Sequence, residues 1–377
     1  MKRYPPFDPP EYIDWAPDPA LVEAYRARVG EEEDRRAIIA ALDDETLLTL
    51  YRGMVRFRLH DISLKRWVRQ GVISKAWLAT GEEAVTIGAV HALDRSQDVV
   101  TPMIRNAGAL HEMGVPLARI FRGYLASATG PNGGRDGHFG DLEHGVLQPV
   151  SHVGDMVPVT TGMALAFQRR GEPRVALTWI GDGGTKTGAF HEGVNLGAVL
   201  GVPAVYIIEN NQVALGTRLD QHQVGDFSDW PAMYGMAGAW ADGNHVLDVY
   251  AAVKLAADRA RAGDGPTLLV VDTFRMGGHA THDEKEARET FPAELFERWG
   301  KRDPIGLYEE YLMAEGVADR EALEAAEAEV SAELEAAVEE ALAARHAEGP
   351  AGESAEYPGV SAGVRQPGLA ARLDAGS

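Results

Sequence analysis

Two short apolar runs separated by a helical stretch form the clearest pattern in the chain. Residues 175–180 and 202–208 are rich in β-branched side chains, and glycine or asparagine ends each run, as expected of buried parallel strands. Residues 189–200 between them are helix-like. Strand, helix and strand with short joints form a βαβ unit, whose right-handed crossover makes the two strands parallel. The pattern predicts an α/β fold, a parallel sheet flanked by helices.

Further elements follow from the same reading. Asp98–Gly108 begins with a short strand end, and 214–242 looks rich in loops. Asp43 or Asp44 is a candidate N-cap for the second helix, and Thr80 for a helix that follows it. Apolar spacing predicts helices over 20–42, 43–70, 116–127, 158–167, 249–262 and 319–347, and a third strand over 267–273.

The two ends of the chain differ from its centre. Residues 1–20 contain six prolines, which predicts an extended arm, and the aromatic residues within it predict packing against its own subunit or a neighbour. Gly, Pro, Ala and Ser dominate 349–377, which predicts a loosely ordered tail. We therefore divide the chain into an arm with a leading helix (1–42), an α/β domain (43–312), a helical segment (313–348) and the tail.

Composition and charge exclude several functional classes. The chain is 45% hydrophobic and 25% charged, which is ordinary for a globular protein. Its net charge of −21 argues against binding nucleic acid or anionic membranes. It has no cysteine, hence no thiolate chemistry. No transmembrane run or secretory signal is evident, and we expect a cytoplasmic protein.

The ends of the two central strands carry candidate chemistry. Asp182 lies in a GDG turn with Gly183 and Gly184, and Asn211 ends the second strand. Parallel strands bring both turns to the carboxyl edge of the sheet, where ligands bind in open α/β folds. A carboxylate, an amide oxygen, a backbone carbonyl and phosphate oxygens would suit Mg²⁺ or Ca²⁺. These residues are also common in plain turns, but two such turns one βαβ unit apart favour a site that joins a metal to a diphosphate.

A family resemblance narrows this interpretation. The GDG turn, a spacer of 26 residues and the NN pair are similar to the thiamine diphosphate motif, and the segments QVALGT and FRMGGHATHDE add to the likeness. From about residue 45 to 312, the chain resembles the α subunit of the decarboxylating first component of 2-oxo acid dehydrogenase complexes, of the pyruvate and branched-chain types. The resemblance implies the thiamine-diphosphate-binding fold, with thiamine diphosphate and Mg²⁺ as cofactors.

The resemblance assigns roles to residues that match the family motif around the metal. It implies that the side chains of Asp182 and Asn211 and the carbonyl of Val213 bind Mg²⁺. It implies that Gly183 and Gly184 contact the diphosphate.

Other matching residues are expected around the rest of the cofactor. Arg105 would clamp the diphosphate, Ser151 would contact the pyrimidine ring through its backbone, and Val153 would be the apolar residue beneath the bent cofactor. His279 would bind the diphosphate, face the substrate and serve catalysis. His138 is a candidate for the substrate carboxylate.

The chain departs from the family pattern at several positions. Ile104 and Val213 stand where the family has Tyr, although any residue can supply a carbonyl ligand. Asp155 and Met156 replace the Thr and Gln of a potassium site, so no potassium is predicted. Ala280 stands where animal members carry a regulatory serine, which excludes phosphorylation there.

The resemblance also implies a partner. The carboxylate that activates the aminopyrimidine ring comes from a second domain that this chain lacks, so a β subunit should complete the site in an α₂β₂ assembly. The expected reaction is oxidative decarboxylation of a 2-oxo acid, with acyl transfer to a lipoyl group on a transacylase core protein. Residues 138–140 and 81–83 favour a branched-chain substrate.

Alternative functions remain open. Pyruvate or acetoin could be the substrate. The chain could also be a detached half of a transketolase-like or decarboxylase enzyme, or a catalytically silent cofactor-binding subunit.

Overall fold

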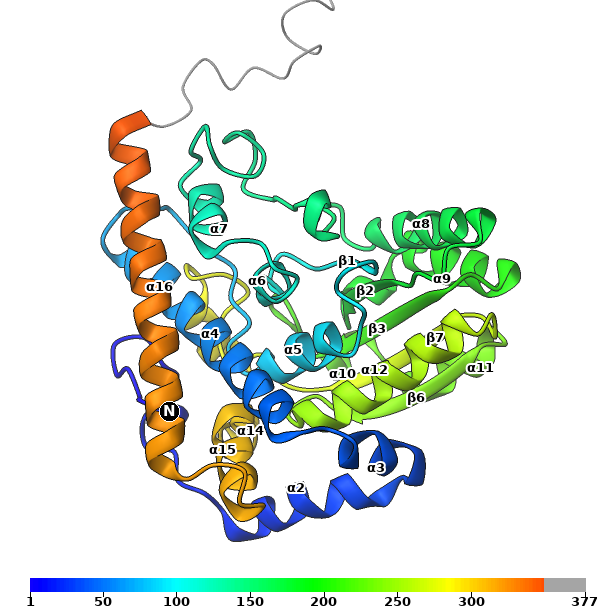
Figure 1. Cartoon of the computed structure of the whole chain (residues 1–377), viewed down its shortest axis with the longest axis horizontal. Helices are drawn as coiled ribbons and strands as arrows, with labels where there is room; N and C mark the ends of the chain where they lie inside the picture. Colours follow the sequence, from blue (N-terminus) through cyan, green and yellow to red (C-terminus); the bar gives the residue numbers. More distant parts are fainter. Residues whose placement is uncertain (349–377) are drawn as a thin grey trace, which may run out of the picture.

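The centre of the computed structural model, which describes residues 1–348, is a five-stranded sheet in the order β1-β2-β3-β7-β6 (Figure 1). All neighbouring pairs are parallel, so the predicted α/β fold with a parallel sheet flanked by helices is confirmed. The strands are β1 (Val99–Thr101), β2 (Ala176–Gly181), β3 (Ala204–Asn210), β6 (Ala237–Asp242) and β7 (Thr267–Asp272).

Helices cover both faces of the sheet. On one face lie α8 (Met156–Arg170) and α9 (Gly188–Leu200), and on the other α5 (Glu83–His91) and α12 (Val246–Arg261) (Figure 1). Successive strand residues point to opposite faces. Trp179 therefore packs in the core beneath α5 and α12, whereas its neighbour Ile180 packs beneath α8 and α9. Burial on both faces explains why β2, β3 and β7 are mostly apolar.

Other helices pack against these layers, and α4 (Asp44–Arg69) and α6 (Gly108–Glu112) among them are largely buried. No helix within residues 1–348 combines the length and apolar character needed to cross a lipid bilayer. The predicted domain boundaries stay predictions, and the predicted tail lies outside the described residues. The remaining helices are α1 (Pro10–Ile13), α2 (Pro19–Glu31), α3 (Glu33–Ala40), α7 (Leu117–Tyr124), α10 (Leu219–His222), α11 (Trp230–Met233), α13 (Glu284–Thr290), α14 (Ala293–Gly300), α15 (Pro304–Ala314) and α16 (Arg320–Glu348).

Three local predictions need correction. The predicted helix over 20–42 is two helices, because Glu32 adopts an extended conformation between α2 and α3. Asp43 does cap α4 by accepting from the Thr46 N–H, but Thr80 does not cap α5, which begins after Glu82 without a side-chain cap. The predicted loop region contains β6, whose Ala- and Gly-rich sequence gives little strand signal and which forms by pairing with β7.

The N-terminal arm packs on its own subunit. It contains a turn at residues 5–7 and the single helical turn of α1, where Tyr12 is completely buried. The indole of Trp15 donates to the Lys301 carbonyl at 3.2 Å. The same ring lies so close to Gly306 that a Cβ there would be 2.7 Å from it. The aromatic residues of the arm therefore anchor it to α14 and α15.

A buried ion network joins the arm to the helices behind the site. The guanidinium of Arg58 on α4 donates to Glu83 at the start of α5, and to Asp303 before α15 at 3.1 Å. Its carbon lies 4.8 Å from the ring centre of Tyr12. The three charged side chains are at most 1% exposed. Arg58 thus fixes where α5 begins.

We predict that Arg58→Met lowers the free energy of unfolding by about 3–5 kcal/mol, because it leaves the buried carboxyl group of Glu83 without its cation and removes one of the two arginines that pair with Asp303. Urea denaturation followed by circular dichroism measures the change. Arg52→Met is the matched control, since Arg52 on the same helix pairs at 3.6 Å with Glu45, which is 79% exposed. The control should cost less than about 1 kcal/mol, and equal effects of the two substitutions would contradict the prediction.

Candidate functional site

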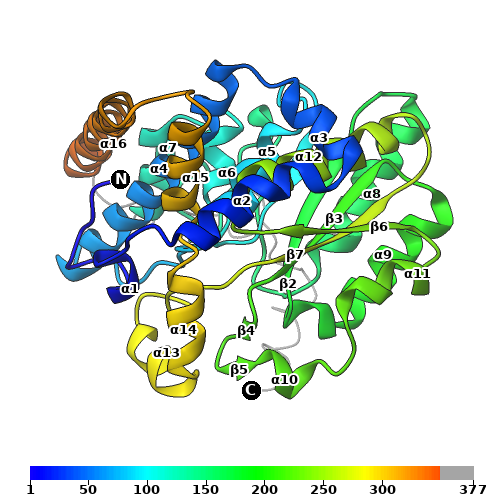
Figure 2. The same ribbon diagram turned by 90° about the horizontal axis from the view of Figure 1, so that it is seen from below.

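The strand register brings four segments to one edge of the sheet. Gly181 of β2 pairs with Glu209 of β3, and Asn210 pairs with Asp272 of β7. The GDG turn, the NN pair and the loop of 273–279 therefore leave the sheet side by side, and the loop that carries Arg105 follows β1. Figure 2 shows a small hairpin, β4 (Val213–Ala214) and β5 (Thr217–Arg218), beyond this end of the sheet.

Close packing requires the glycines of the GDG turn. A Cβ on Gly183 would lie 2.4 Å from the Cβ of Ala214 in the hairpin. A Cβ on Gly184 would lie 2.5 Å from Ile180 and 2.9 Å from Val153. The backbone of the turn is therefore bare, as a diphosphate-binding turn requires. The structure also places Val153 against this turn.

Asp182 is buried beside a histidine from a later loop. Its side chain is 1% exposed, and its Oδ2 lies 3.0 Å from Nε2 of His222 on α10. Burial raises the pKa of Asp182 above its ordinary value, while His222 and Arg105 act in the opposite direction. A cation would stabilise the charged form of this carboxylate. Nothing in the local sequence around His222 indicates this contact.

A turn with an unusual backbone holds the other two predicted metal ligands. Gln212 has φ +66°, which non-glycine residues seldom adopt. This conformation lets the Val213 N–H donate to Oδ1 of Asn211 at 3.3 Å. The Val213 carbonyl accepts from Nη1 of Arg275, also at 3.3 Å. Each predicted metal-binding oxygen therefore has a protein hydrogen-bonding partner.

The donor set fits a metal only if a ligand supplies further oxygens. Within residues 1–348, no group of three or more His, Asp or Glu side chains could hold a metal ion by itself. The predicted set contains one carboxylate, from Asp182, together with the neutral oxygens of Asn211 and Val213. An all-oxygen set of this kind suits Mg²⁺ when phosphate oxygens complete it. The residues present are thus compatible with a metal bound together with a diphosphate.

Two buried arginines make the edge electropositive. Burial opposes the charge of Arg105, but Glu82 holds the pKa of Arg105 above its ordinary value. Its Nε lies 3.5 Å from Glu82 and has no hydrogen-bond partner. Burial and the charge of Arg105 lower the pKa of Arg275 to about 10. A diphosphate would stabilise both cations. Arg275 was missed from the sequence, although it shares the predicted loop of His279.

A pair of buried carboxyl groups lies beneath these arginines. Glu82 and Glu209 are both completely buried. Burial disfavours the ionised form of Glu82, but Arg105, Glu209 and Asn211 together hold its pKa below the ordinary value. Burial and the charge of Glu82 hold the pKa of Glu209 well above its ordinary value. Glu209 is therefore the neutral partner, and Asn106 donates to its Oε2 at 2.8 Å.

His279 faces the same positive environment. It lies in the loop after β7, as predicted, and is partly buried. Burial and the charges of Arg105 and Arg275 lower its pKa to about 4. His279 is therefore neutral at pH 7. A neutral imidazole can both donate and accept a proton, which suits its predicted role.

The residues predicted for the substrate and for the head of the cofactor are more open to solvent. Nε2 of His138 lies 3.3 Å from Oγ of Ser151. Ser151 is exposed and Val153 is 59% exposed, whereas Asp182 and Asn211 are each 1% exposed. The site is thus closed around Asp182 and Asn211 and open around Ser151 and Val153.

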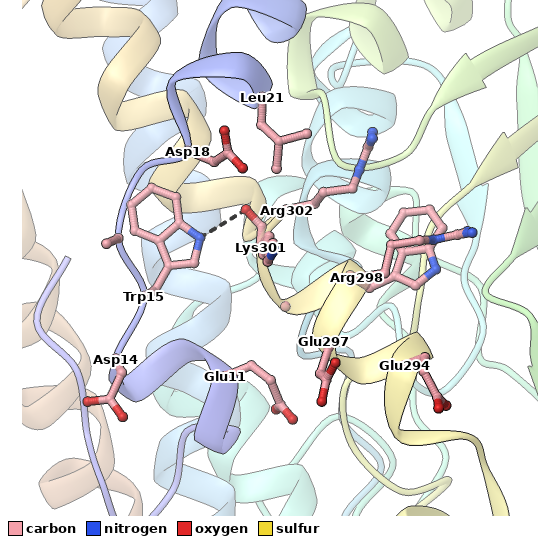
Figure 3. Close-up of a pocket in the computed structure, with 13 residues that line it drawn as sticks. Glu11, Asp14, Trp15, Asp18, Leu21, Glu294, Glu297, Arg298, Lys301 and Arg302 are labelled. Carbon is pink, nitrogen blue, oxygen red and sulfur yellow. Dashed lines mark hydrogen bonds between the residues drawn. The ribbon is translucent and has the colours of Figure 1, made fainter.

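A large cavity elsewhere contains none of these residues. It has a volume of about 980 Å³ and lies between the N-terminal arm and α14 (Figure 3). Trp15 lines one side of it, and Glu297 and Arg298 line another. Its size does not make it the candidate site, because the converging buried polar groups lie at the strand ends.

Comparisons with known proteins agree with this geometry. Residues 51–348 match the family described as dehydrogenase E1 component. The 2-oxoisovalerate dehydrogenase subunit alpha of Bacillus subtilis (strain 168) is 34% identical over 310 residues, which cover 81% of this chain and 93% of that protein. The pyruvate dehydrogenase E1 component subunit alpha of Staphylococcus aureus (strain MRSA252) is 32% identical and covers 80% of each chain. The 3-methyl-2-oxobutanoate dehydrogenase subunit alpha of Mycobacterium tuberculosis (strain CDC 1551 / Oshkosh) is 34% identical and covers 73% of each.

We predict that the backbone of Gln212 makes the site sensitive to β-branched residues there. Gln212→Val should lower the free energy of unfolding by about 1–2 kcal/mol, because its side chain disfavours positive φ. Gln212→Gly, which loses the same side-chain contact with the Thr273 carbonyl, is the matched control and should fold at least as stably as the valine variant. A valine variant as stable as the wild type in urea denaturation would contradict this prediction.

We predict a pH-dependent contribution of His279 to stability. An unfolded histidine binds a proton near pH 6.5, whereas folded His279 does so only near pH 4. The unfolded chain therefore carries more protons between these values, so the contribution of His279 to stability falls as the pH decreases from 6.5 to 4. Thermal midpoints measured at several pH values should show the stability of His279→Asn rising relative to that of the wild type as the pH falls across this window. A constant difference between pH 7 and pH 4 would contradict the assignment.

Proposed function

The chain belongs to the dehydrogenase E1 component family, and we propose that it is the α subunit of a thiamine-diphosphate-dependent enzyme that oxidatively decarboxylates branched-chain 2-oxo acids. The observation that carries this proposal is the buried edge of the sheet. There Asp182, Asn211 and Arg105 converge behind a glycine turn that a Cβ would block. Relatives named as α subunits of 2-oxo acid dehydrogenases support the reaction class.

The residues of this chain would hold the diphosphate end of the cofactor. Asp182, Asn211 and the carbonyl of Val213 would bind Mg²⁺. Arg105 and Arg275 would neutralise the phosphates, and the bare backbone of the GDG turn would approach them closely. Thiamine diphosphate, when bound, supplies an electron sink for the decarboxylation. The contribution of this chain is therefore placement of the cofactor and electrostatic stabilisation.

A second chain would complete the site. The three buried carboxyl groups at the edge already have partners: Asp182 has His222, Glu82 has Asn211, and Glu209 has Asn106. None of these three is free to act on a pyrimidine ring. The open ring end around Ser151 and Val153 is where we place a β subunit that supplies this carboxylate. We propose an α₂β₂ assembly that acts in the cytoplasm and passes the acyl group to a lipoyl-bearing transacylase core.

An apolar surface favours a branched-chain substrate over pyruvate or acetoin. Met103, Ile104 and Phe139 line a small cavity of about 20 Å³ beside His138. Ile104 stands where the family has Tyr, so an aliphatic side chain replaces an aromatic phenol next to the Arg105 clamp. An aliphatic substrate side chain would gain from contact with such a surface. His138 would face the substrate carboxylate from the same side.

We predict decarboxylation of branched-chain 2-oxo acids when this chain is co-expressed with its β subunit and supplied with thiamine diphosphate, Mg²⁺ and a dye acceptor. Initial rates over a panel of branched-chain acids, pyruvate and acetoin give the specificity. Asp182→Asn should lower kcat/KM by about 100-fold or more, because the metal loses its only carboxylate. Asp220→Asn is the matched control on α10, where Asp220 is 70% exposed, and should have little effect.

Two results would overturn this proposal. A preference for pyruvate or acetoin would contradict the proposed substrate but would leave the family assignment unchanged. An assembly that binds thiamine diphosphate and turns over no 2-oxo acid would instead support a silent cofactor-binding subunit.

A further inference from the structure

Glu82 is a buried carboxylate that neither the proposed metal set nor the diphosphate contacts include. Its side chain is completely buried, and it lies where α5 begins, behind the edge of the sheet that carries Asn211. A buried carboxylate needs donors that offset the loss of water. The donors around Glu82 therefore show what it holds in place.

The backbone at Glu82 is fixed by the loop after β7. Gly81 has φ +99°, and a Cβ there would lie 2.6 Å from the Phe274 carbonyl oxygen. The Thr273 hydroxyl donates to the Gly81 carbonyl at 3.1 Å, and the Met276 N–H donates to the Thr80 carbonyl at 3.0 Å. These contacts leave Glu82 little freedom to move.

One oxygen of Glu82 binds the amide of Asn211 directly. Oε1 of Glu82 accepts from Nδ2 of Asn211 at 2.7 Å. The other oxygen, Oε2, lies 3.5 Å from the Arg105 guanidinium. Nδ2 of Asn211 is the donor and Oε1 of Glu82 the acceptor, so this bond turns the NH₂ end of the amide toward Glu82.

This contact decides which end of the amide faces the metal position. The oxygen and nitrogen of an asparagine amide are nearly the same size, so only hydrogen bonds select between the two orientations. The Val213 N–H favours the same orientation, but its bond to Oδ1 is longer, at 3.3 Å. In the reversed orientation, NH₂ would point at the metal position and could not bind a cation.

We propose that Glu82 is a positioning residue that holds Oδ1 of Asn211 toward the metal by accepting from its NH₂ group. The proposal rests on the proposed function, because it requires a metal at Asp182, Asn211 and Val213. Glu82 touches neither metal nor substrate in this role. It acts 129 residues away in sequence from the ligand that it orients.

The first test measures Mg²⁺ binding by the α and β subunits assembled together. Isothermal titration calorimetry with Mg²⁺ at saturating thiamine diphosphate gives the Kd. Glu82→Leu should raise this Kd by about 10-fold or more, as expected when a residue that orients a metal ligand is removed. Glu82→Gln should stay within about twofold of the wild type, because its amide oxygen can still accept from Asn211.

The second test asks whether residues 82 and 211 are coupled. In Asn211→Asp, a carboxylate replaces the carboxamide, so that an oxygen takes the place of the NH₂ group and faces Glu82. A glutamine at position 82 can donate to that carboxylate, so Glu82→Gln should lower the Mg²⁺ Kd of the Asn211→Asp variant by about 10-fold. The same substitution should leave the Kd of the Asn211 protein nearly unchanged. This non-additivity identifies a direct contact, and it remains measurable if Glu82→Leu does not fold.

The outcomes separate this proposal from the proposed function. Wild-type affinity for Mg²⁺ in folded Glu82→Leu would overturn the positioning role, as would an equal effect of Glu82→Gln in both backgrounds. Thermal midpoints without cofactor identify a general loss of stability, which would not make the Mg²⁺ Kd fall in the Asn211→Asp background and stay unchanged in the Asn211 background. A wild-type assembly that binds no thiamine diphosphate in the presence of Mg²⁺ would overturn the proposed function itself.

Discussion

Parallel pairing of β1, β2, β3 and β7 is the constraint on which the site depends. Parallel strands must all end at the same edge, so four loops that are distant in sequence leave the sheet together. The one-to-one register of β2 with β3 fixes the spacing of the GDG and NN turns. Helices on both faces bury most residues of these strands, which prevents a slip in register that would move one turn past the other. The packing of the sheet therefore determines which side chains meet at this edge.

The edge also concentrates charge where water is absent. Each buried ion there is stabilised by a neighbour from another segment: Arg105 by Glu82, Asp182 by His222, and Glu82 by Asn211. The two arginines depress the pKa of His279, and a polyanionic ligand beside them would offset this effect. In the proposed function, the same residues that make the site costly to bury would favour a diphosphate bound together with a metal. Arg58 has a parallel role behind the site, where it neutralises Glu83 next to Glu82.

Sequence patterns predict the parts of this arrangement that have local signals. The βαβ unit follows from apolar runs, and Asp182, Asn211, Arg105 and His279 could be placed at strand ends because they follow such runs or match a motif. Glu82, Arg275 and His222 could not be assigned in the same way. Their roles come from contacts across 129, 62 and 40 residues, which depend on tertiary packing that no window of sequence contains. The strand β6 was not predicted for a related reason, since its Ala- and Gly-rich sequence forms a strand only through pairing with β7.

The turn at Gly81 packs so closely against the loop after β7 that substitutions at Gly81 depend on the position of that loop. Any side chain there would collide with the Phe274 carbonyl, and its left-handed backbone excludes β-branched residues. A larger residue could enter only if the loop after β7 retreated, and that loop carries both Arg275 and His279. A substitution at Gly81, which has no chemical role of its own, would thus weaken the phosphate contacts proposed for the loop after β7. In a mutational scan, Gly81 would be grouped with the ligand-binding residues although it binds nothing.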